Sequence, residues 1–310
     1  MKIVIVGPGA MGSLLAAFLS KTKQDIWLLD KDRERASRIN SGGITMEGVS
    51  GDWQVKVQIT VEAKEVGEAD LAIICVKSGD TKDAALALRP AIGSKSRILT
   101  LQNGLGNLEI ISEVLGGEKV IGGVTNLGAT LVEPGKVRHA GKGETIIGRI
   151  DGKIPVEMRY IRELFNRAGL DTRISKDIKS ILWSKLIINA GINALTAITR
   201  LNNGRLLEFE GSRKILREAV AEATKVAKRK RIKLIYDDPL AKAEAVCEAT
   251  AANISSMLAD VLKRKRTEID FINGVIVRQG QELGISVPVN SVLLDLVKTI
   301  EASYSKEVKR

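Results

Sequence analysis

The sequence predicts an α/β protein in which a doubly wound parallel sheet is followed by an all-helical C-terminal domain. Over the first 148 residues, short β-branched runs alternate with helical patterns. A glycine-rich turn, Gly7-Pro-Gly-Ala-Met-Gly12, follows the first run and opens a helical pattern. From Ile178 onwards we find helical periods and no convincing strand. We therefore expect a first domain over residues 1–175 and a second over 176–310.

The first domain contains six expected strands that alternate with helices. The run Lys2–Val6 is short and β-branched, which is typical of a buried strand. The other strands are expected at 25–30, 70–76, 97–101, 119–123 and 144–148. Helices are expected from the glycine turn to about Leu19 and at 31–40, 80–88 and 108–115. This alternation favours parallel strands, because each helix returns the chain to the same edge of the sheet.

The second domain is expected to be a bundle of five helices. Their apolar periods predict helices at 178–198, 212–230, 239–262, 268–283 and 291–303, with a loop at 286–290. The sequence contains no internal repeat and no low-complexity segment.

Composition is that of an ordinary globular protein with a basic surface. Hydrophobic residues make up 44% and charged residues 27%, and the formal net charge is +11. Basic runs at 228–231 and 263–266 leave a nucleic-acid partner open, but no aromatic residues are interleaved, so solvated helix faces are favoured. Cys75 and Cys247 lie far apart and predict no disulfide, which fits a reducing cytoplasm. We expect no signal peptide, no membrane span and no metal site.

The glycine-rich turn predicts a dinucleotide site. Gly7 permits a tight turn, Gly9 lets the backbone approach a pyrophosphate, and Gly12 lets the helix pack on the strand. Pro8, Ala10 and Met11 complete the binding turn, with phosphates at the N-terminus of the helix.

Asp30 ends the second strand, where a carboxylate accepts hydrogen bonds from the adenosine ribose diol and repels a 2′-phosphate. This favours NADH. Lys31 and Arg33 follow at once and can instead hold a 2′-phosphate, so NADPH stays open. Asp30 can also be an acidic residue at a helix N-terminus.

A polar stripe crosses the apolar segment from Trp183 to Ile198. Lys185, Asn189 and Asn193 are spaced four residues apart, which places them on one face of a helix. A lysine and two carboxamides in apolar surroundings are costly unless a partner or ligand pairs with them. The stripe therefore suits a ligand that carries carbonyl, hydroxyl and carboxylate groups, although a solvent-facing stripe is the alternative.

Three further stretches carry polar side chains. Cys75-Val-Lys77-Ser78 and Leu101-Gln-Asn103-Gly-Leu-Gly106 each follow a strand, where ligands of such sheets bind. Asn253-Ile-Ser-Ser-Met257 leads to Arg266-Thr-Glu268-Ile-Asp270. The acidic residues of the last stretch can also be a first helical turn.

Together these motifs resemble the 2-dehydropantoate 2-reductase (ketopantoate reductase) family, over nearly the whole chain and in the right order. The family consists of a Rossmann-type domain and a helical domain. The resemblance implies that Lys185 is the proton donor to the substrate ketone and that Glu268 lies near substrate and nicotinamide. It implies cofactor contacts and substrate contacts as follows: Lys77, Asn103 and Ala129 for the cofactor, and Asn103, Asn189, Asn193, Asn203, Asn253 and Ser256 for the substrate. Asp30 departs from the basic residue that family members using NADPH tend to have there.

The chemistry agrees with this resemblance. Reducing a 2-oxo acid needs a hydride for the carbonyl carbon and a proton for its oxygen, and a lysine ammonium can give that proton. His139 is the only histidine, so a histidine acid is poorly supported. We expect reduction of 2-dehydropantoate to (R)-pantoate, for pantothenate and coenzyme A biosynthesis, by a cytoplasmic homodimer open to feedback by coenzyme A.

Two alternatives remain. One is a reductase of another small 2-oxo acid or of an imine. The other is a non-catalytic dinucleotide-sensing or nucleic-acid-binding protein, although a sensor needs no proton donor.

Overall fold

The computed structural model describes residues 1–306 and separates into two compact units. The α/β unit comprises Met1–Gln102 and Asn107–Ile178. The helical unit comprises the short segment Asn103–Gly106 and the chain from Lys179 onwards.

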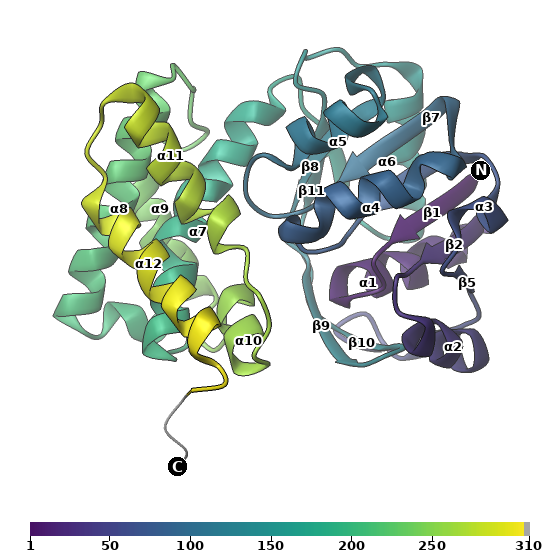
Figure 1. Cartoon of the computed structure of the whole chain (residues 1–310), viewed down its shortest axis with the longest axis horizontal. Coiled ribbons are helices and arrows are strands. Elements are labelled where there is room, and N and C mark those ends of the chain that lie inside the picture. Colours follow the sequence, from purple (N-terminus) through teal and green to yellow (C-terminus); the bar gives the residue numbers. More distant parts are fainter. Residues whose placement is uncertain (307–310) are drawn as a thin grey trace. The chain divides into compact units, whose positions relative to one another are not determined.

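The α/β unit is built on an eight-stranded sheet with the order β12-β11-β8-β7-β6-β1-β2-β5 (Figure 1). Neighbouring strands are parallel except β8 and β11, which are antiparallel, so the sheet is mixed but mostly parallel. The strands are β1 Lys2–Val6, β2 Asp25–Leu29, β5 Gln58–Thr60, β6 Ala69–Ile74, β7 Ile92–Thr100, β8 Val120–Thr125, β11 Thr145–Gly148 and β12 Thr172–Ile174. The chain leaves β1 towards β2 and later returns to β6 on its other side. This makes the β1–β6 boundary the switch point at which such sheets bind ligands.

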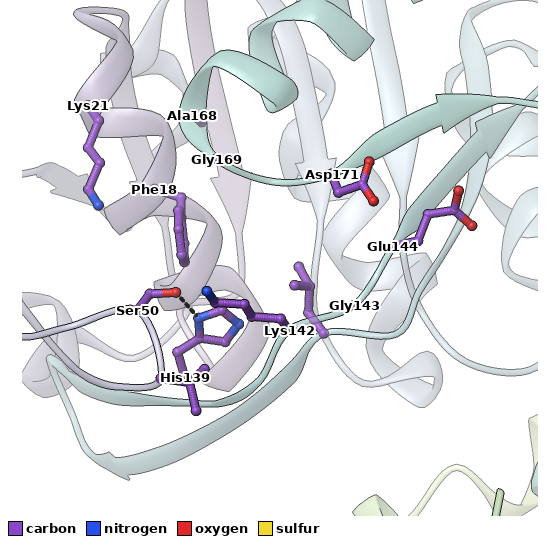
Figure 2. A pocket seen from close by; sticks show the side chains of 12 residues that line it. Phe18, Lys21, Ser50, His139, Lys142, Gly143, Glu144, Ala168, Gly169 and Asp171 are labelled. Carbon is purple, nitrogen blue, oxygen red and sulfur yellow. Dashed lines mark hydrogen bonds between the residues drawn. The ribbon is translucent and has the colours of Figure 1, made fainter. Parts of the chain in front are cut away.

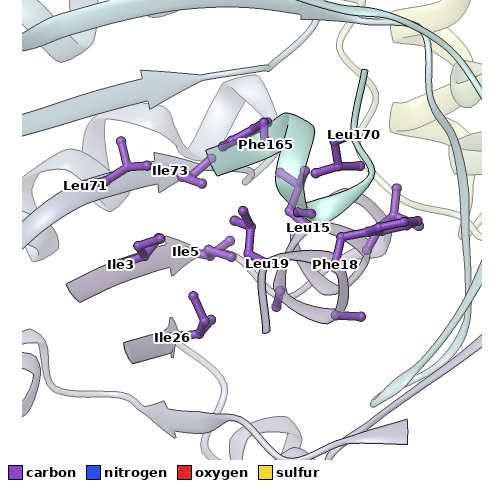
Figure 3. Close-up of a cluster of buried hydrophobic side chains, with 14 of the residues drawn as sticks. Ile3, Ile5, Leu15, Phe18, Leu19, Ile26, Leu71, Ile73, Phe165 and Leu170 are labelled. Atoms are coloured by element: carbon purple, nitrogen blue, oxygen red, sulfur yellow. The ribbon is translucent and has the colours of Figure 1, made fainter. Parts of the chain in front are cut away.

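Helices cover both faces of this sheet, because its strands are apolar on both sides. In β1, Ile3 and Ile5 pack into one core with α1 (Ala10–Leu19) and α6 (Val156–Ala168), as Figure 3 shows. Val4 and Val6 point to the other face and pack with α4 (Thr81–Leu88) and α5 (Asn107–Leu115). The remaining helices of this unit are α2 Arg33–Gly42 and α3 Ala63–Val66.

Several elements of the α/β unit were not assigned from the sequence. A second, four-stranded sheet has the order β4-β3-β10-β9, and α1 packs against it. Its strands are β3 Ile44–Gly48, β4 Trp53–Val55, β9 Gly128–Glu133 and β10 Lys136–Gly141. These strands are short and half-polar, so their periodicity is weak. The helix α6 and the three-residue β12 were missed as well.

The helical unit consists of six helices among its described residues, which contain no strand: α7 Ile178–Thr199, α8 Glu210–Arg229, α9 Pro239–Ala249, α10 Ser256–Leu262, α11 Asn273–Leu283 and α12 Pro288–Ser303. The single helix expected at 239–262 is wrong, because Ser255 caps a new helix by accepting the Leu258 N–H at 3.0 Å. The helix expected at 268–283 begins only at Asn273, after a 3-10 turn at Ile269–Phe271. Pro288 starts α12 earlier than expected, since proline suits the first turn of a helix.

The helix α7 is the centre of the helical unit. It is long and apolar enough to span a membrane, but 83% of its apolar window is buried inside the protein, so it is a core helix. Gly191 permits its close approach to α8, because a Cβ there would lie 2.7 Å from a methyl carbon of Val220. The polar stripe of Lys185, Asn189 and Asn193 is thus carried by a rigid element.

Candidate active site

The glycine-rich turn lies at the end of β1 and forms an open cradle. Gly7 has a φ of +90°, and a Cβ at Gly12 would lie 2.2 Å from the Gly7 carbonyl oxygen, so both positions require glycine. A Cβ at Gly9, by contrast, would meet nothing within 4 Å. Open space at Gly9 is what a backbone needs where phosphates approach it.

The N-terminus of α1 completes this cradle. Its N-cap, Gly9, provides no side-chain hydrogen bond, and the first intrahelical bond runs from the Ser13 N–H to the Gly9 carbonyl at 3.0 Å. The N–H groups of Ala10, Met11 and Gly12 precede that bond and are suited to an anion. The Ser13 hydroxyl holds the turn by donating to the Pro8 carbonyl at 3.2 Å. The residues present therefore fit the pyrophosphate of a dinucleotide.

Lys77 lies in the loop after β6, on the other side of the switch point, and is partly buried. A buried polar network holds this loop. The Gln102 amide donates to the Val76 carbonyl at 2.9 Å and to the Thr81 hydroxyl at 2.8 Å. Thr81 in turn donates to Asn107 at 2.9 Å. The sequence indicated the Lys77 loop but not these supporting side chains.

Asp30 is 4% exposed and is held by a residue that the sequence reasoning missed. Arg35, on the first turns of α2, donates from Nε to Oδ2 and from Nη2 to Oδ1 of Asp30, both at 2.5 Å. Both carboxylate oxygens that a ribose diol would use are therefore engaged by one guanidinium. Asp32, and not Asp30, caps α2. The only sequence signal for this pair is that Asp30 and Arg35 lie five residues apart, on either side of the start of α2.

Lys31 and Arg33 also lie near this strand end, but each has an acidic partner. Lys31 Nζ lies 3.1 Å from Asp80 Oδ1, and Arg33 Nη2 lies 3.9 Å from Glu62 Oε1. Both basic side chains are largely exposed, so these ion pairs are weak.

In the helical unit, Lys185 and Glu268 interact electrostatically. Burial lowers the pKa of Lys185 from 10.5 to about 8, and the Glu268 carboxylate partly opposes that decrease. Glu268 itself is 6% exposed, just before the 3-10 turn that precedes α11. A lysine with a lowered pKa beside a buried carboxylate is typical of a catalytic acid or base.

Asn103 reaches the same part of the helical unit through a backbone contact. The Leu105 N–H donates to the Phe271 carbonyl at 3.0 Å, three residues after Glu268. Gly104 has a φ of +84°, and a Cβ there would lie 2.3 Å from that carbonyl oxygen. Only glycine therefore allows the Asn103 loop to lie against the Glu268 turn.

The remaining candidates form two smaller groups. The Thr196 hydroxyl on α7 donates to the Asn193 carbonyl at 2.9 Å and to the Ser255 hydroxyl at 2.7 Å, which ties the stripe to the start of α10 at Ser256. The Asn203 N–H donates to the Asn253 carbonyl at 3.0 Å. The Asn203 Oδ1 is buried and has no hydrogen-bond partner within residues 1–306.

Two candidates make no side-chain hydrogen bond within residues 1–306. Asn189 is partly buried on α7 between Lys185 and Asn193. Ala129 lies on β9, opposite His139 of β10, and packs on the core beside α1.

The cradle at the switch point defines the class of protein: a Rossmann-type protein that binds a dinucleotide. Residues 3–152 match the family model described as "Ketopantoate reductase PanE/ApbA", and residues 177–301 match its C-terminal model. The chain belongs to this family, as its motifs predicted.

Relatives of known name agree with this assignment. The chain is 37% identical to the 2-dehydropantoate 2-reductase of Pyrococcus horikoshii over 302 residues, covering 97% of this chain and 98% of that protein. It is 35% identical to the enzyme of the same name from Halobacterium salinarum over 300 residues, covering 96% and 98%.

Solved structures with the same fold carry more than one enzyme name. The fold matches a ketopantoate reductase of this family from Ralstonia eutropha with a TM-score of 0.91 at 36% identity, covering 98% of this chain and 99% of that one. It also matches D-mandelate dehydrogenase in complex with NADH and anilino(oxo)acetate, with a TM-score of 0.93 at 27% identity, covering 99% and 100%. The chain is therefore an NAD(P)H-dependent reductase of 2-oxo acids.

Proposed function

We propose that this enzyme reduces 2-dehydropantoate to (R)-pantoate, a step in the biosynthesis of pantothenate and coenzyme A. The observation that carries the proposal is Lys185, a lysine of lowered pKa beside the buried Glu268. The full-length relatives named 2-dehydropantoate 2-reductase support the choice of substrate.

The glycine cradle and Lys77 would hold a reduced nicotinamide dinucleotide, which would supply the hydride that the C2 carbonyl carbon of the substrate requires. Lys185 donates a hydrogen bond to the carbonyl oxygen, stabilises the negative charge that develops there, and then gives that oxygen a proton. Because its pKa is about 8, Lys185 is mostly protonated at neutral pH and still releases its proton readily. The negative charge of Glu268 favours the protonated form of Lys185, so that the proton donor carries its proton.

Carboxamide and hydroxyl groups bind the rest of the substrate. Asn189 and Asn193 lie one and two helical turns beyond Lys185 and offer donors and acceptors to the carboxylate and hydroxyl groups. Asn103, Asn203, Asn253 and Ser256 provide further contacts to the substrate. These carboxamide and hydroxyl groups are neutral, so they bind the substrate carboxylate through hydrogen bonds and not through an ion pair.

For the cofactor, the glycine cradle with Lys77 and Ala129 holds the dinucleotide, and the pair of Asp30 and Arg35 sets the preference between NADH and NADPH. When the Asp30 carboxylate is released by Arg35 and accepts hydrogen bonds from the ribose diol, NADH is favoured. When Arg35 turns towards a 2′-phosphate, the same site takes NADPH.

Substrate assignment is tested with the purified enzyme and 2-dehydropantoate. We expect oxidation of NADH or NADPH with pantoate as product, and a loss of turnover of about 10²- to 10⁴-fold in Lys185→Ala. Full activity in that variant would contradict the assigned proton donor. No turnover of 2-dehydropantoate by the native enzyme would contradict the substrate.

A second candidate follows from the likeness to D-mandelate dehydrogenase, whose complex contains anilino(oxo)acetate. A reductase of another 2-oxo acid would use the same donor and cradle. Competition between 2-dehydropantoate and a panel of aliphatic and aromatic 2-oxo acids separates the two, because the physiological substrate has the highest kcat/KM.

Cofactor preference is tested by comparing kcat/KM for NADH and NADPH in the native enzyme, Asp30→Ala and Arg35→Gln. We expect Arg35→Gln to free the carboxylate and shift preference towards NADH by about tenfold, and Asp30→Ala to shift it towards NADPH. Binding of 5′-AMP and 2′,5′-ADP to the same variants should change in parallel without any turnover. Equal ratios in all three proteins would refute the role of the pair.

The cellular setting completes the proposal. We propose a cytoplasmic homodimer that is inhibited by coenzyme A, a product that carries both an adenine nucleotide and a pantoyl unit. Steady-state rates measured with saturating coenzyme A test the inhibition, and sedimentation tests the dimer.

A further inference from the structure

The α/β unit contains a cavity that the proposed reaction does not use. Its volume is about 700 Å³, within the range of sites for small organic molecules. It is lined by residues of the first helix, the second sheet and the loops at 142–144 and 168–171 (Figure 2). Phe18, Leu127 and Ala168 give it an apolar wall.

This cavity is remote from the glycine cradle. Phe18 lies in the last turn of α1 and Lys21 in the 3-10 turn that follows it, whereas Gly9 precedes the N-terminal end of α1. The helix has ten residues and is therefore about 15 Å long. A molecule in this cavity would not occupy the dinucleotide site.

A buried histidine gives the cavity a polar floor. His139 is 2% exposed, and its Nδ1 lies 2.7 Å from the Ser50 hydroxyl. Its Nε2 is buried and has no hydrogen-bond partner within residues 1–306. The Phe18 ring and the imidazole are nearly perpendicular, with ring centres 5.3 Å apart, and this packing fixes the orientation of the imidazole. Burial lowers the pKa of His139, a backbone hydrogen bond with Gly141 opposes that decrease, and the charge of Lys142 lowers the pKa further.

The charges around the cavity are arranged at two ends. Lys21 and Lys142 lie on the side of Ser50 and His139, and neither lysine forms an ion pair within the described chain. Lys21 Nζ stands 3.4 Å from the ring centre of Trp53, which holds it in place. Asp171 and Glu144 lie at the other end (Figure 2), and Glu144 is already paired with Arg173 at 2.6 Å.

We propose that this cavity is a second binding site, for a small organic acid with an apolar body. The carboxylate lies towards Lys21, Lys142 and the Ser50–His139 pair, and the apolar body covers Phe18 and Leu127. A hydroxyl or amino group at the far end donates to Asp171. Two lysines against one unpaired aspartate leave the lining with a single positive charge, which suits a monoanion better than a dianion.

The test uses 4-hydroxybenzoate as the probe, because it has a carboxylate, a flat apolar ring and a hydroxyl at the far end. His139 is the only histidine of the chain and lines this cavity, so its imidazole NMR signals are assigned without ambiguity and shift when a molecule enters the cavity. We expect saturable shifts of these signals on titration, with and without saturating NADH. The measurement needs no turnover, so it stands apart from the outcome of the proposed reaction.

Matched compounds and variants identify the contacts. Uncharged 4-hydroxybenzamide should bind at least tenfold more weakly, and phenyl phosphate, a dianion, should also bind more weakly. The double variant Lys21→Met and Lys142→Met should lose at least tenfold in affinity. Lys64→Met with Lys95→Met removes the same charge from exposed positions outside the cavity and should bind like the native protein.

Unmoved His139 signals at millimolar 4-hydroxybenzoate would overturn the proposal. Equal binding of the amide would do the same, and so would displacement of the probe by NADH.

Discussion

Replacing Glu268 by Gln should move the alkaline limit of activity to lower pH. Lys185 must carry a proton to reduce the substrate, and its pKa is about 8 because burial outweighs the opposing charge of Glu268. Glutamine has the same size as glutamate but no charge. The variant therefore removes the influence of the Glu268 charge, which raises the pKa of Lys185, and that pKa should fall further.

The size of the effect follows from this pKa. In the native enzyme about nine-tenths of Lys185 is protonated at pH 7, and about one-tenth at pH 9. Neighbouring, partly buried charges typically interact by about 1.4 kcal/mol or more, which corresponds to a change of about one unit in the pKa of either group. A decrease of about one pH unit would leave about half of Lys185 protonated at pH 7 and about one-hundredth at pH 9. The rate at pH 9 should thus fall about tenfold relative to the native enzyme, and at pH 7 only about twofold.

The assay is kcat/KM for the oxo acid at saturating reduced cofactor, measured from pH 6 to 10. The matched control is Asp270→Asn, two residues further on. Asp270 Oδ1 lies 3.0 Å from Lys298 Nζ and its Oδ2 lies 3.6 Å from Arg266 Nη2, so its charge is already compensated. We expect the control to keep the native alkaline limb.

Two outcomes would refute this reasoning. An unchanged alkaline limb in Glu268→Gln would mean that Glu268 does not govern the proton of Lys185. A limb displaced to higher pH would mean that the group titrating there is not a lysine destabilised by burial. A uniform loss at every pH would indicate a positioning role for Glu268 without control of the pKa.

Three glycine substitutions give further tests. Gly12→Ala should cost about 1–3 kcal/mol of stability in urea unfolding, because its Cβ would lie 2.2 Å from the Gly7 oxygen. Gly9→Ala should unfold like the native protein and yet bind NADH at least tenfold more weakly in fluorescence titration, since its Cβ meets only open space. Gly104→Ala, at a φ of +84° and 2.3 Å from the Phe271 oxygen, should lower kcat more than cofactor affinity, because it displaces the Asn103 loop; an unchanged kcat there would contradict the placement of Asn103.

The fold was predictable where periodicity was strong. All six expected strands are present, and the apolar alternation of Ile3 and Ile5 against Val4 and Val6 explains why both faces of β1 are covered. The second sheet was not predictable, because its pairing of β3 with β10 joins segments about ninety residues apart. The break between α9 and α10 depends on Ser255, a cap that an apolar period running through 239–262 conceals.

The sequence predicted which candidate residues share a helix or follow a strand, but not the contacts between elements that position them. The four-residue spacing placed Lys185, Asn189 and Asn193 on one helix. By contrast, the engagement of Asp30 by Arg35 depends on where α2 begins, which an aspartate-rich stretch leaves ambiguous. The docking of the Asn103 loop on Phe271 joins segments more than one hundred and sixty residues apart, and no local pattern encodes it.

The protonated form of Lys185 is required for activity but destabilises the folded protein. Its folded pKa of about 8 is lower than the 10.5 of an ordinary lysine, so folding is opposed wherever the lysine is protonated in both states, which is below pH 8. The difference of about 2.5 pH units corresponds to roughly 3 kcal/mol, an upper limit because the side chain is partly accessible to solvent. Between pH 8 and 10.5 only the unfolded chain keeps the proton, so this cost fades and stability from this residue rises with pH. Over the same interval the proton donor is lost. The apolar helix α7 therefore tolerates a costly lysine at neutral pH, where the charged form is the one that catalysis requires.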